Sequence, residues 1–285
     1  MKRAIRQIPL AKPVYRHFKK NAKQVYRHFK EKEYKRKFAT DGYSCFWGVF
    51  ETFEQAKQAA PQTKTVGYDN AELAQEYRQM LEQDNWENSG RVIASFDYPV
   101  LFWLKSAFSE GCTQIFDFGG NVGTHYYSYS KYLEYPESLK WIICEVPEIA
   151  KVGRELAEHR AVEALDFTTD FNDSHGADIF ISSGAIQYVE NLAHALSLLK
   201  KKPKHILINR LPLYNGEQFV TLQNGGKVFY PQYVFNQDEF IGGLQNLGYE
   251  LVDIWDDRVD SCAIPFHPDR LVPFYSGLYL KLNLA

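Results

Sequence analysis

The stretch Thr113–Gly123 reads T-Q-I-F-D-F-G-G-N-V-G and joins a short apolar segment to a glycine-rich turn. Ile115, Phe116 and Phe118 suit a strand that is buried on both faces, as in a parallel sheet covered by helices. The glycines that follow lack Cβ atoms, which lets the backbone turn sharply and a ligand approach closely. The stretch therefore predicts a strand that runs into a ligand-binding turn.

The spacing within this turn bears on which ligand it would take. Helical spacing of aromatic and apolar residues over 124–133 predicts that the turn leads into a helix. A dinucleotide fingerprint requires G-x-G-x-x-G, which no window here supplies. The chain instead has Asp117 in the strand and then Gly119, Asn121 and Gly123 at alternate positions. A glycine-rich turn without any ligand is the alternative interpretation.

This pattern resembles motif I of class I S-adenosylmethionine-dependent methyltransferases, with Asn121 in place of the usual middle glycine. The resemblance implies S-adenosylmethionine as the cofactor. The residues that it assigns to cofactor binding in this motif are Asp117, Phe118, Gly119, Gly120, Asn121 and Gly123.

Length and composition set the frame for these motifs. The 285 residues allow one large α/β domain with an appendage, and 45% hydrophobic and 24% charged residues are ordinary for a globular protein. The four cysteines are dispersed without a C-x-x-C pair, so we expect neither a zinc site nor a disulfide framework, and a reducing cytoplasm fits best. No apolar run approaches the ~20 residues needed to cross a bilayer. We therefore predict no transmembrane helix and no signal peptide.

The N-terminal 37 residues differ sharply in charge from the rest. Nine Lys and five Arg against two Glu give them +12, so the remaining chain carries −14. The segment V-Y-R-H-F-K occurs at 14–19 and again at 25–30, which is close to three helical turns apart. This repeat predicts a basic amphipathic helix. Its apolar stripe would consist of Val14, Phe18, Ala22, Val25 and Phe29.

Three roles compete for this arm. It can lie on an anionic membrane, contact nucleic acid phosphates, or pack on its own domain as a solvated helix. Tyr and Phe on the stripe favour a membrane over nucleic acid. We expect a cytoplasmic protein, with peripheral attachment to the inner membrane through residues 1–37 as one option.

Helical signals dominate residues 38–110. Thr52 and Gln55 form a T-x-x-Q capping box, and Asn70 begins a second helix with apolar residues on one face. A third helical segment over 91–110 is interrupted at Pro99. We interpret 38–110 as a helical N-terminal layer and 111–285 as the cofactor-binding domain.

Four separated segments carry a closer resemblance. They read F-W-G-V-F-E-T-F-E-Q-A at 46–56, G-Y-D at 67–69, D-F-G-G-N-V-G at 117–123 and S-S-G-A-I-Q-Y-V at 182–189. Over residues 40–283 the chain resembles a family of methyltransferases encoded in bacterial surface-polysaccharide gene clusters. The resemblance implies a Rossmann-like methyltransferase fold and methyl transfer to a sugar or polysaccharide precursor. The partner would be a small-molecule or glycan acceptor.

The apolar segments predict a doubly wound, mostly parallel seven-stranded sheet. Its strands would be the segment before the glycine turn, 141–145, 162–167, 177–182, 205–209, 249–255 and 276–283. Glu145 ends the second strand, where a carboxylate can accept both ribose hydroxyls of a nucleoside. Its alternatives are a solvated strand end or a cap for the helix after Pro147. The resemblance places Phe167 near the adenine ring as a stacking candidate.

Residues after the fourth and fifth strands should border the ligands. Open α/β sheets bind ligands beyond the carboxyl ends of their strands, which places Ser183, Gly184 and Gln187 beside the cofactor and the acceptor. Tyr188 is expected to border both ligands as well and is a catalytic candidate. The alternative for Tyr188 is that its side chain packs on the sheet. Arg210 suits an anionic group on the acceptor or a structural salt bridge. The long connection 211–235 reads as a hairpin lid that shapes the acceptor pocket.

A hydroxyl acceptor would need a general base, and His125 and His267 are the candidates by residue type. No cluster of carboxylates and histidines suggests a metal. Two other functions remain open from the sequence. One is a catalytically silent methyltransferase-like binding module, which Asn121 and the lack of an evident base allow. The other is an NAD-type oxidoreductase, which the missing G-x-G-x-x-G argues against.

Overall fold

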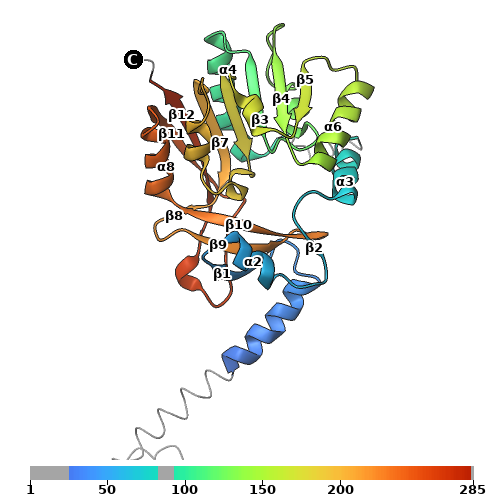
Figure 1. Cartoon of the computed structure of the whole chain (residues 1–285), viewed down its shortest axis with the longest axis vertical. Coiled ribbons are helices and arrows are strands. Elements are labelled where there is room, and N and C mark those ends of the chain that lie inside the picture. The colour runs from blue at the N-terminus through green and yellow to red at the C-terminus, as the bar shows by residue number, and fades with distance from the viewer. Residues whose placement is uncertain (1–25, 83–92, 284–285) are drawn as a thin grey trace, which may run out of the picture.

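The fold is built on a large sheet, seen in a computed structural model that describes residues 26–82 and 93–283. Its seven strands are β3 (Gln114–Phe118), β4 (Lys140–Cys144), β5 (Leu165–Thr168), β6 (Ile179–Ser183), β7 (His205–Leu211), β11 (Tyr249–Asp257) and β12 (Tyr275–Leu282). Their order across the sheet is β11-β12-β7-β6-β3-β4-β5 (Figure 1). Strands β3 to β7 run parallel, whereas β12 is antiparallel to both neighbours. The predicted doubly wound, mostly parallel seven-stranded sheet is confirmed.

Both faces of the central strands of this sheet are buried. Neighbouring residues of one strand belong to different apolar clusters: Ile115 packs with α4 (Tyr98–Ser109) on one side, and Phe116 packs with α7 (Leu192–Ser197) on the other. The remaining helices along the sheet are α5 (Thr124–Tyr129), α6 (Pro147–His159) and α8 (Gln237–Gln245). Pro99 lies in the first turn of α4 and so begins this helix rather than interrupting it.

The strand order reverses between β3 and β6. From β3 the chain moves outward to β4 and β5, and it then returns to the opposite side of β3 to form β6 and β7. The connections after β3 and β6 therefore leave the sheet in opposite directions. The carboxyl ends of these two strands face the crevice between the connections. This reversal explains why the glycine turn and the Ser183 segment come together.

A second, smaller sheet forms beside the first. It has the order β1-β9-β10-β2, and β8 pairs with β10. The strands are β1 (Phe46–Phe50), β2 (Thr65–Val66), β8 (Leu213–Tyr214), β9 (Phe219–Asn224) and β10 (Val228–Asn236). The connection 211–235 thus contains the predicted hairpin, because β9 and β10 pair antiparallel.

The expected helical layer over 38–110 is a mixture of helices and strands. The capping box of Thr52 is confirmed at α2 (Phe53–Ala59), and Asn70 accepts from the Leu73 N–H at the start of α3 (Ala71–Glu82). However, β1 and β2 also lie in this stretch. Phe46–Phe50 forms a strand because the hairpin of β9 and β10 supplies an edge to pair with, and a local sequence pattern does not reveal so distant a partner.

The described part of the basic arm is a helix over 26–39, which projects away from the smaller sheet (Figure 1). Its last turns dock: the Tyr34 hydroxyl donates to the Phe46 carbonyl at 2.8 Å, and Phe38 is fully buried, stacking on Phe229 with ring centroids 5.2 Å apart. The predicted boundary at residue 37 therefore falls inside a helix. The stripe residues Val14, Phe18, Ala22 and Val25 lie outside the described residues.

Candidate active site

A cavity of about 840 Å³ opens at the carboxyl ends of β3, β4 and β6. Its walls come from the larger sheet, from α3 and from the segment before α3. The lining residues are Tyr43, Tyr68, Tyr77, Met80, Leu81, Phe118, Gly119, Asn121, Thr124, His125, Cys144, Glu145, Val146, Pro147, Ile149, Thr169, Ser183, Gly184, Ala185, Tyr188 and Arg210. The cavity thus lies at the switch point of the sheet, where open α/β proteins bind ligands.

The glycine turn adopts a conformation that explains its sequence. Gly119 has φ +76°, and a Cβ built there would lie 2.2 Å from the Ala185 Cβ. Asn121 is left-handed with φ +58°, and its Oδ1 accepts from the Val122 N–H at 2.7 Å. Asn tolerates this region because its short side chain can bond locally, as it does here. The departure from the usual glycine is therefore accommodated in the backbone.

Glu145 holds the turn from the neighbouring strand. Its Oε1 accepts from the Asn121 N–H at 3.0 Å, and its Oε2 accepts from the Val146 N–H at 3.1 Å. Burial raises the pKa of this carboxyl to about 7, against the opposing effect of the two backbone hydrogen bonds. Each oxygen retains lone pairs that can accept from a ligand. Because Glu145 lines the cavity, it is not a solvated strand end.

The cap of α6 comes from elsewhere in the chain. The Glu148 N–H donates to Asp69 Oδ1 at 3.0 Å, so the G-Y-D segment caps the helix that follows β4. Asp69 thereby ties the N-terminal segment to the sheet at the edge of the cavity. Sequence reasoning singled out G-Y-D only as part of a resemblance and gave Asp69 no role.

Asp117 lies behind the cavity wall and pairs with His125. The Asp117 side chain is fully buried, and its Oδ2 accepts from Trp141 Nε1 at 3.1 Å and lies 3.4 Å from His125 Nδ1. Burial by itself would lower the pKa of His125. The Asp117 carboxylate, its hydrogen bond and nearby Asp97 outweigh burial and raise that pKa above its ordinary value. An Nδ1–H held by Asp117 leaves Nε2 of His125 as an acceptor at the cavity wall.

Most of the predicted site residues line the cavity. Those on its wall are Phe118, Gly119, Asn121, His125, Glu145, Ser183, Gly184, Tyr188 and Arg210. The predicted residues that do not line it are Asp117, Gly120, Gly123, Phe167, Gln187 and His267. Gly120 still serves the turn, because a Cβ there would lie 2.4 Å from Asp117 Oδ2.

Phe167 and His267 have other surroundings. Phe167 is 3% exposed and packs under α6, where a Cβ on Gly153 would come within 2.3 Å of its ring. Its ring belongs to an apolar core cluster, and Thr169, just beyond the end of β5, lines the wall instead. His267 precedes a short 3₁₀ turn in the loop between β11 and β12, and its N–H donates to the Ile264 carbonyl at 3.1 Å. Neither Phe167 nor His267 lines the cavity.

Arg210 sits at the wall in a strained conformation. It is left-handed with φ +58°, which is uncommon for a residue that is not glycine. Its Nε donates to Asp260 Oδ2 at 2.7 Å, and its guanidinium lies over the Phe96 ring at 5.1 Å. The structural salt bridge considered from the sequence is present, and the guanidinium also lines the cavity.

Three tyrosines from distant segments meet over the cavity. The hydroxyls of Tyr68 and Tyr188 are 2.8 Å apart, and Tyr68 stacks on Tyr230 with ring centroids 4.5 Å apart. Tyr188 therefore packs on other aromatics as well as lining the wall. Sequence reasoning missed the grouping, since Tyr230 belongs to the hairpin and Tyr68 to the G-Y-D segment.

Two buried polar atoms near the cavity lack partners in the part of the chain that the structure describes, and one of them lies at its wall. Ser183 Oγ and Gln187 Oε1 are buried and have no hydrogen-bond partner among the described residues. Ser183 lines the cavity, and Gln187 is oriented by donating from Nε2 to the Gly184 carbonyl at 2.8 Å. Such atoms call for a ligand or water, because an unpaired buried polar group is costly.

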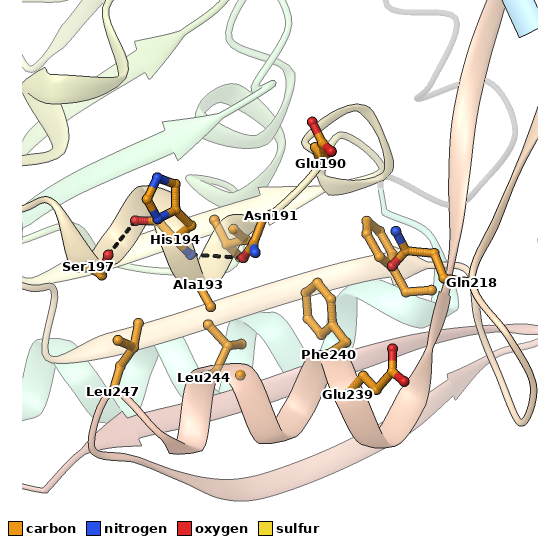
Figure 2. Close-up of a pocket in the computed structure, with 13 residues that line it drawn as sticks. Glu190, Asn191, Ala193, His194, Ser197, Gln218, Glu239, Phe240, Leu244 and Leu247 are labelled. Carbon is orange, nitrogen blue, oxygen red and sulfur yellow. Dashed lines mark hydrogen bonds between the residues drawn. The ribbon is translucent and has the colours of Figure 1, made fainter. Parts of the chain in front are cut away.

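Two further cavities differ in character. One of about 280 Å³ adjoins the first and shares Leu81, Thr124, His125, Ser183 and Arg210 with it. Another of about 520 Å³ lies between α7 and α8, where Figure 2 shows His194 and Phe240 on opposite walls. None of the predicted site residues lines this third cavity. Across residues 26–82 and 93–283, no group of His, Cys, Asp and Glu is placed to hold a metal.

Fold and site together define a doubly wound α/β protein with a cavity for a ligand at its switch point. The sequence matches no protein-family model and no curated protein. Solved structures that it resembles include magnesium protoporphyrin IX methyltransferase from Synechocystis PCC 6803 with bound SAM, at 11% identity and TM-score 0.41 over 76% of this chain and 87% of that one. They also include S-adenosylmethionine-dependent methyltransferases from Clostridium acetobutylicum ATCC 824 (8%, TM-score 0.44, 74% and 98%) and from Mesorhizobium loti (14%, TM-score 0.43, 67% and 99%). Likenesses this weak say nothing about cofactor, substrate or residue roles.

Proposed function

We propose that the chain is an S-adenosylmethionine-dependent methyltransferase that acts on a hydroxyl group. The observation that carries this proposal is the placement of Glu145. Its carboxylate ends the strand beside the glycine turn, is fixed by two backbone N–H groups and lines a cavity at the switch point. A carboxylate so placed suits the two ribose hydroxyls of a nucleoside.

The rest of the cavity fits the other parts of this cofactor. Val146 and Pro147 offer an apolar wall for a base next to Glu145. Gly119 and Asn121 bring backbone close to the opposite end, where an amino-acid moiety would lie. The volume of about 840 Å³ lies within the range of small-molecule sites and leaves space for an acceptor beside the cofactor.

His125 is the group placed to take a proton from the acceptor. Bound S-adenosylmethionine would supply a methyl group on a cationic sulfur, which leaves as a neutral thioether. The acceptor oxygen gains the methyl group and loses its proton to His125 Nε2. Asp117 contacts no ligand in this scheme and acts as a positioning residue, since it fixes the ring through Nδ1 and stabilises the imidazolium that forms.

The acceptor class follows from the resemblance to polysaccharide-cluster methyltransferases, and the tyrosines are compatible with it. Tyr68 and Tyr188 present ring surface and hydroxyls at the wall, a combination that suits a sugar ring. The hairpin of β9 and β10 contributes Tyr230 to this group and so helps to shape the acceptor side. We therefore include a sugar or a polysaccharide precursor in the proposal.

A cytoplasmic location with attachment to an anionic membrane surface is the second part of the proposal. All four cysteines are free, as expected in a reducing compartment. On the helix over 26–39, Tyr26 and Phe29 are each 65% exposed among basic side chains. Within the described residues, no helix is long and apolar enough to span a bilayer. Apolar rings beside Lys and Arg suit the surface of an anionic membrane.

A thermal-shift screen tests the cofactor. S-adenosylmethionine and S-adenosylhomocysteine, at ~100 times their dissociation constants, should stabilise the fold by ~2.7 kcal/mol. NAD and NADP should have no effect at the same concentrations. Stabilisation by NAD alone would favour an oxidoreductase, and binding without turnover on any acceptor would favour a silent binding module.

A further inference from the structure

We infer that the cavity of about 280 Å³ beside the main one binds a phosphate group of the acceptor. This inference rests on the proposed methyl transfer for its role, although the binding itself can be tested separately. The residues that line this smaller cavity are Leu81, Ile93, Ala94, Phe96, Asp97, Thr124, His125, Tyr127, Ser128, Lys131, Arg160, Ser183 and Arg210.

The charge of this cavity differs from that of its neighbour. Arg160 and Arg210 line it, and Asp97 is the one carboxylate among its described lining residues. In the larger cavity Arg210 and Glu145 are the charged lining residues, and their formal charges cancel. Two guanidinium groups at one cavity favour an anion, and a phosphate offers them more acceptor oxygens than a carboxylate does.

The acidic group in the small cavity has hydrogen-bond donors of its own. Asp97 is 8% exposed and accepts from the Tyr129 hydroxyl at 2.9 Å and from Asn209 Nδ2 at 3.2 Å. Asn209 is itself held, because its Oδ1 accepts from Trp255 Nε1 at 3.1 Å. The Asp97 carboxylate is thus satisfied by neutral donors.

Arg210 is held in a fixed position for an anion. Asp260 binds its Nε, Phe96 covers its face, and its backbone is left-handed at φ +58°. No described residue accepts a hydrogen bond from its two terminal nitrogens. Strain of this kind persists where the surrounding structure enforces it, commonly at ligand sites.

Ser183 provides an independent sign of a ligand at the same wall. Its Oγ is buried without a partner and lines both cavities. Arg160 closes the far side, with its guanidinium 4.5 Å from the Tyr127 ring centre. A phosphate between Arg160 and Arg210 would satisfy Ser183 as well.

The two cavities share the wall that carries His125. An acceptor anchored by its phosphate in the small cavity would present a neighbouring hydroxyl to His125 Nε2 and to the methyl group in the large one. The acceptor is therefore a phosphorylated hydroxyl compound, such as a sugar phosphate, in which the methylated oxygen lies a few bonds from the phosphate.

Calorimetric titration with inorganic phosphate tests the site at constant ionic strength. Arg160→Gln should weaken phosphate binding by roughly tenfold, because a charged hydrogen bond contributes ~1.5–3 kcal/mol. Lys151→Gln removes an equally exposed cation from the same helix, outside the cavity, and should leave phosphate binding unchanged. S-adenosylhomocysteine affinity should stay at the wild-type value in both variants.

Arg210→Lys keeps the charge but loses the planar fork, and it should also weaken phosphate binding by roughly tenfold. Circular dichroism of each variant checks the fold. Equal phosphate affinity in wild type, Arg160→Gln and Arg210→Lys would overturn the inference, as would acetate binding as tightly as phosphate. The protein could also bind phosphate through Arg160 without binding S-adenosylhomocysteine. That result would support the anion site and contradict the proposed methyltransferase function.

Discussion

The Oε1 atom of Glu145 accepts a hydrogen bond from the backbone N–H of Asn121 at 3.0 Å. The carboxylate at the end of β4 and the turn after β3 therefore form one unit. A left-handed residue that is not glycine is stabilised by this bond and by its own side chain, which accepts from the Val122 N–H. The unit connects the glycine-rich turn with the carboxylate that we propose binds the ribose.

Glu145→Ala should weaken S-adenosylhomocysteine binding by about 1–3 kcal/mol, because two hydrogen bonds to the ribose and the support of the turn are lost. Isothermal titration calorimetry measures this directly. Glu158→Gln, which neutralises an exposed carboxylate on α6, is the matched control and should bind as the wild type does. Equal affinity in all three proteins would remove Glu145 from the site.

Cofactor binding should depend on pH through the same residue. Burial raises the pKa of Glu145 to about 7, so the free protein holds this carboxyl protonated below that pH. Ribose hydroxyls donate to the ionised form, so affinity should fall as pH falls through 7, by up to about tenfold per pH unit. Above pH 8 it should level off. Glu145→Gln should bind weakly with no such slope, and a slope that persists in this variant would assign the titration to another group.

His125→Gln should lower kcat by ~10²–10⁴ and leave S-adenosylhomocysteine affinity unchanged, since only the proton acceptor is removed. His267→Gln is the control, because His267 does not line the cavity. Full activity in His125→Gln on the natural acceptor would rule out His125 as the base.

Asp117→Asn tests the positioning role by a readout that loss of stability does not mimic. The Asp117 carboxylate raises the pKa of His125, and removing its charge should lower that pKa. The acidic limb of the kcat profile should then move to lower pH, because the imidazole stays neutral further down the scale. A reduced kcat with an unmoved limb would show that Asp117 acts only on packing.

Binding to anionic vesicles should depend on the arm. Truncation before residue 31 removes Tyr26 and Phe29 but keeps Tyr34 and Phe38, which dock the helix on the smaller sheet. Co-sedimentation with vesicles of anionic lipid should fall on truncation, and it should fall for the full chain as salt rises. If the truncated chain binds vesicles as well as the full chain does, the arm does not attach the protein to anionic membranes.

The sequence predicts most of the larger sheet, and the reasons are local. Buried strands such as Gln114–Phe118 read as apolar runs, and caps such as Thr52, which accepts from the Gln55 N–H, depend on residues three positions apart. The smaller sheet was not predictable in this way, since β1 pairs with β9 far along the chain. Its hairpin was visible only as a long insertion.

The candidate site, too, was predictable from the sequence only in part. Glu145 and Ser183 follow from strand ends and sheet topology, which place carboxyl ends together. The direction of a side chain does not follow from spacing alone: Phe167 faces the core, and Asp117 turns toward Trp141 and His125 rather than to the cavity. Similarly, the grouping of Tyr68, Tyr188 and Tyr230 needs three segments to meet in space.

A crystal structure of the protein with S-adenosylhomocysteine tests the central claim most directly. Both ribose hydroxyls should donate to the Glu145 carboxylate at ~2.7–3.0 Å, with the base against Val146 and the amino-acid end at the turn of Gly119 and Asn121. The ligand found elsewhere, for example between α7 and α8, or in the cavity without contact to Glu145, would contradict the account.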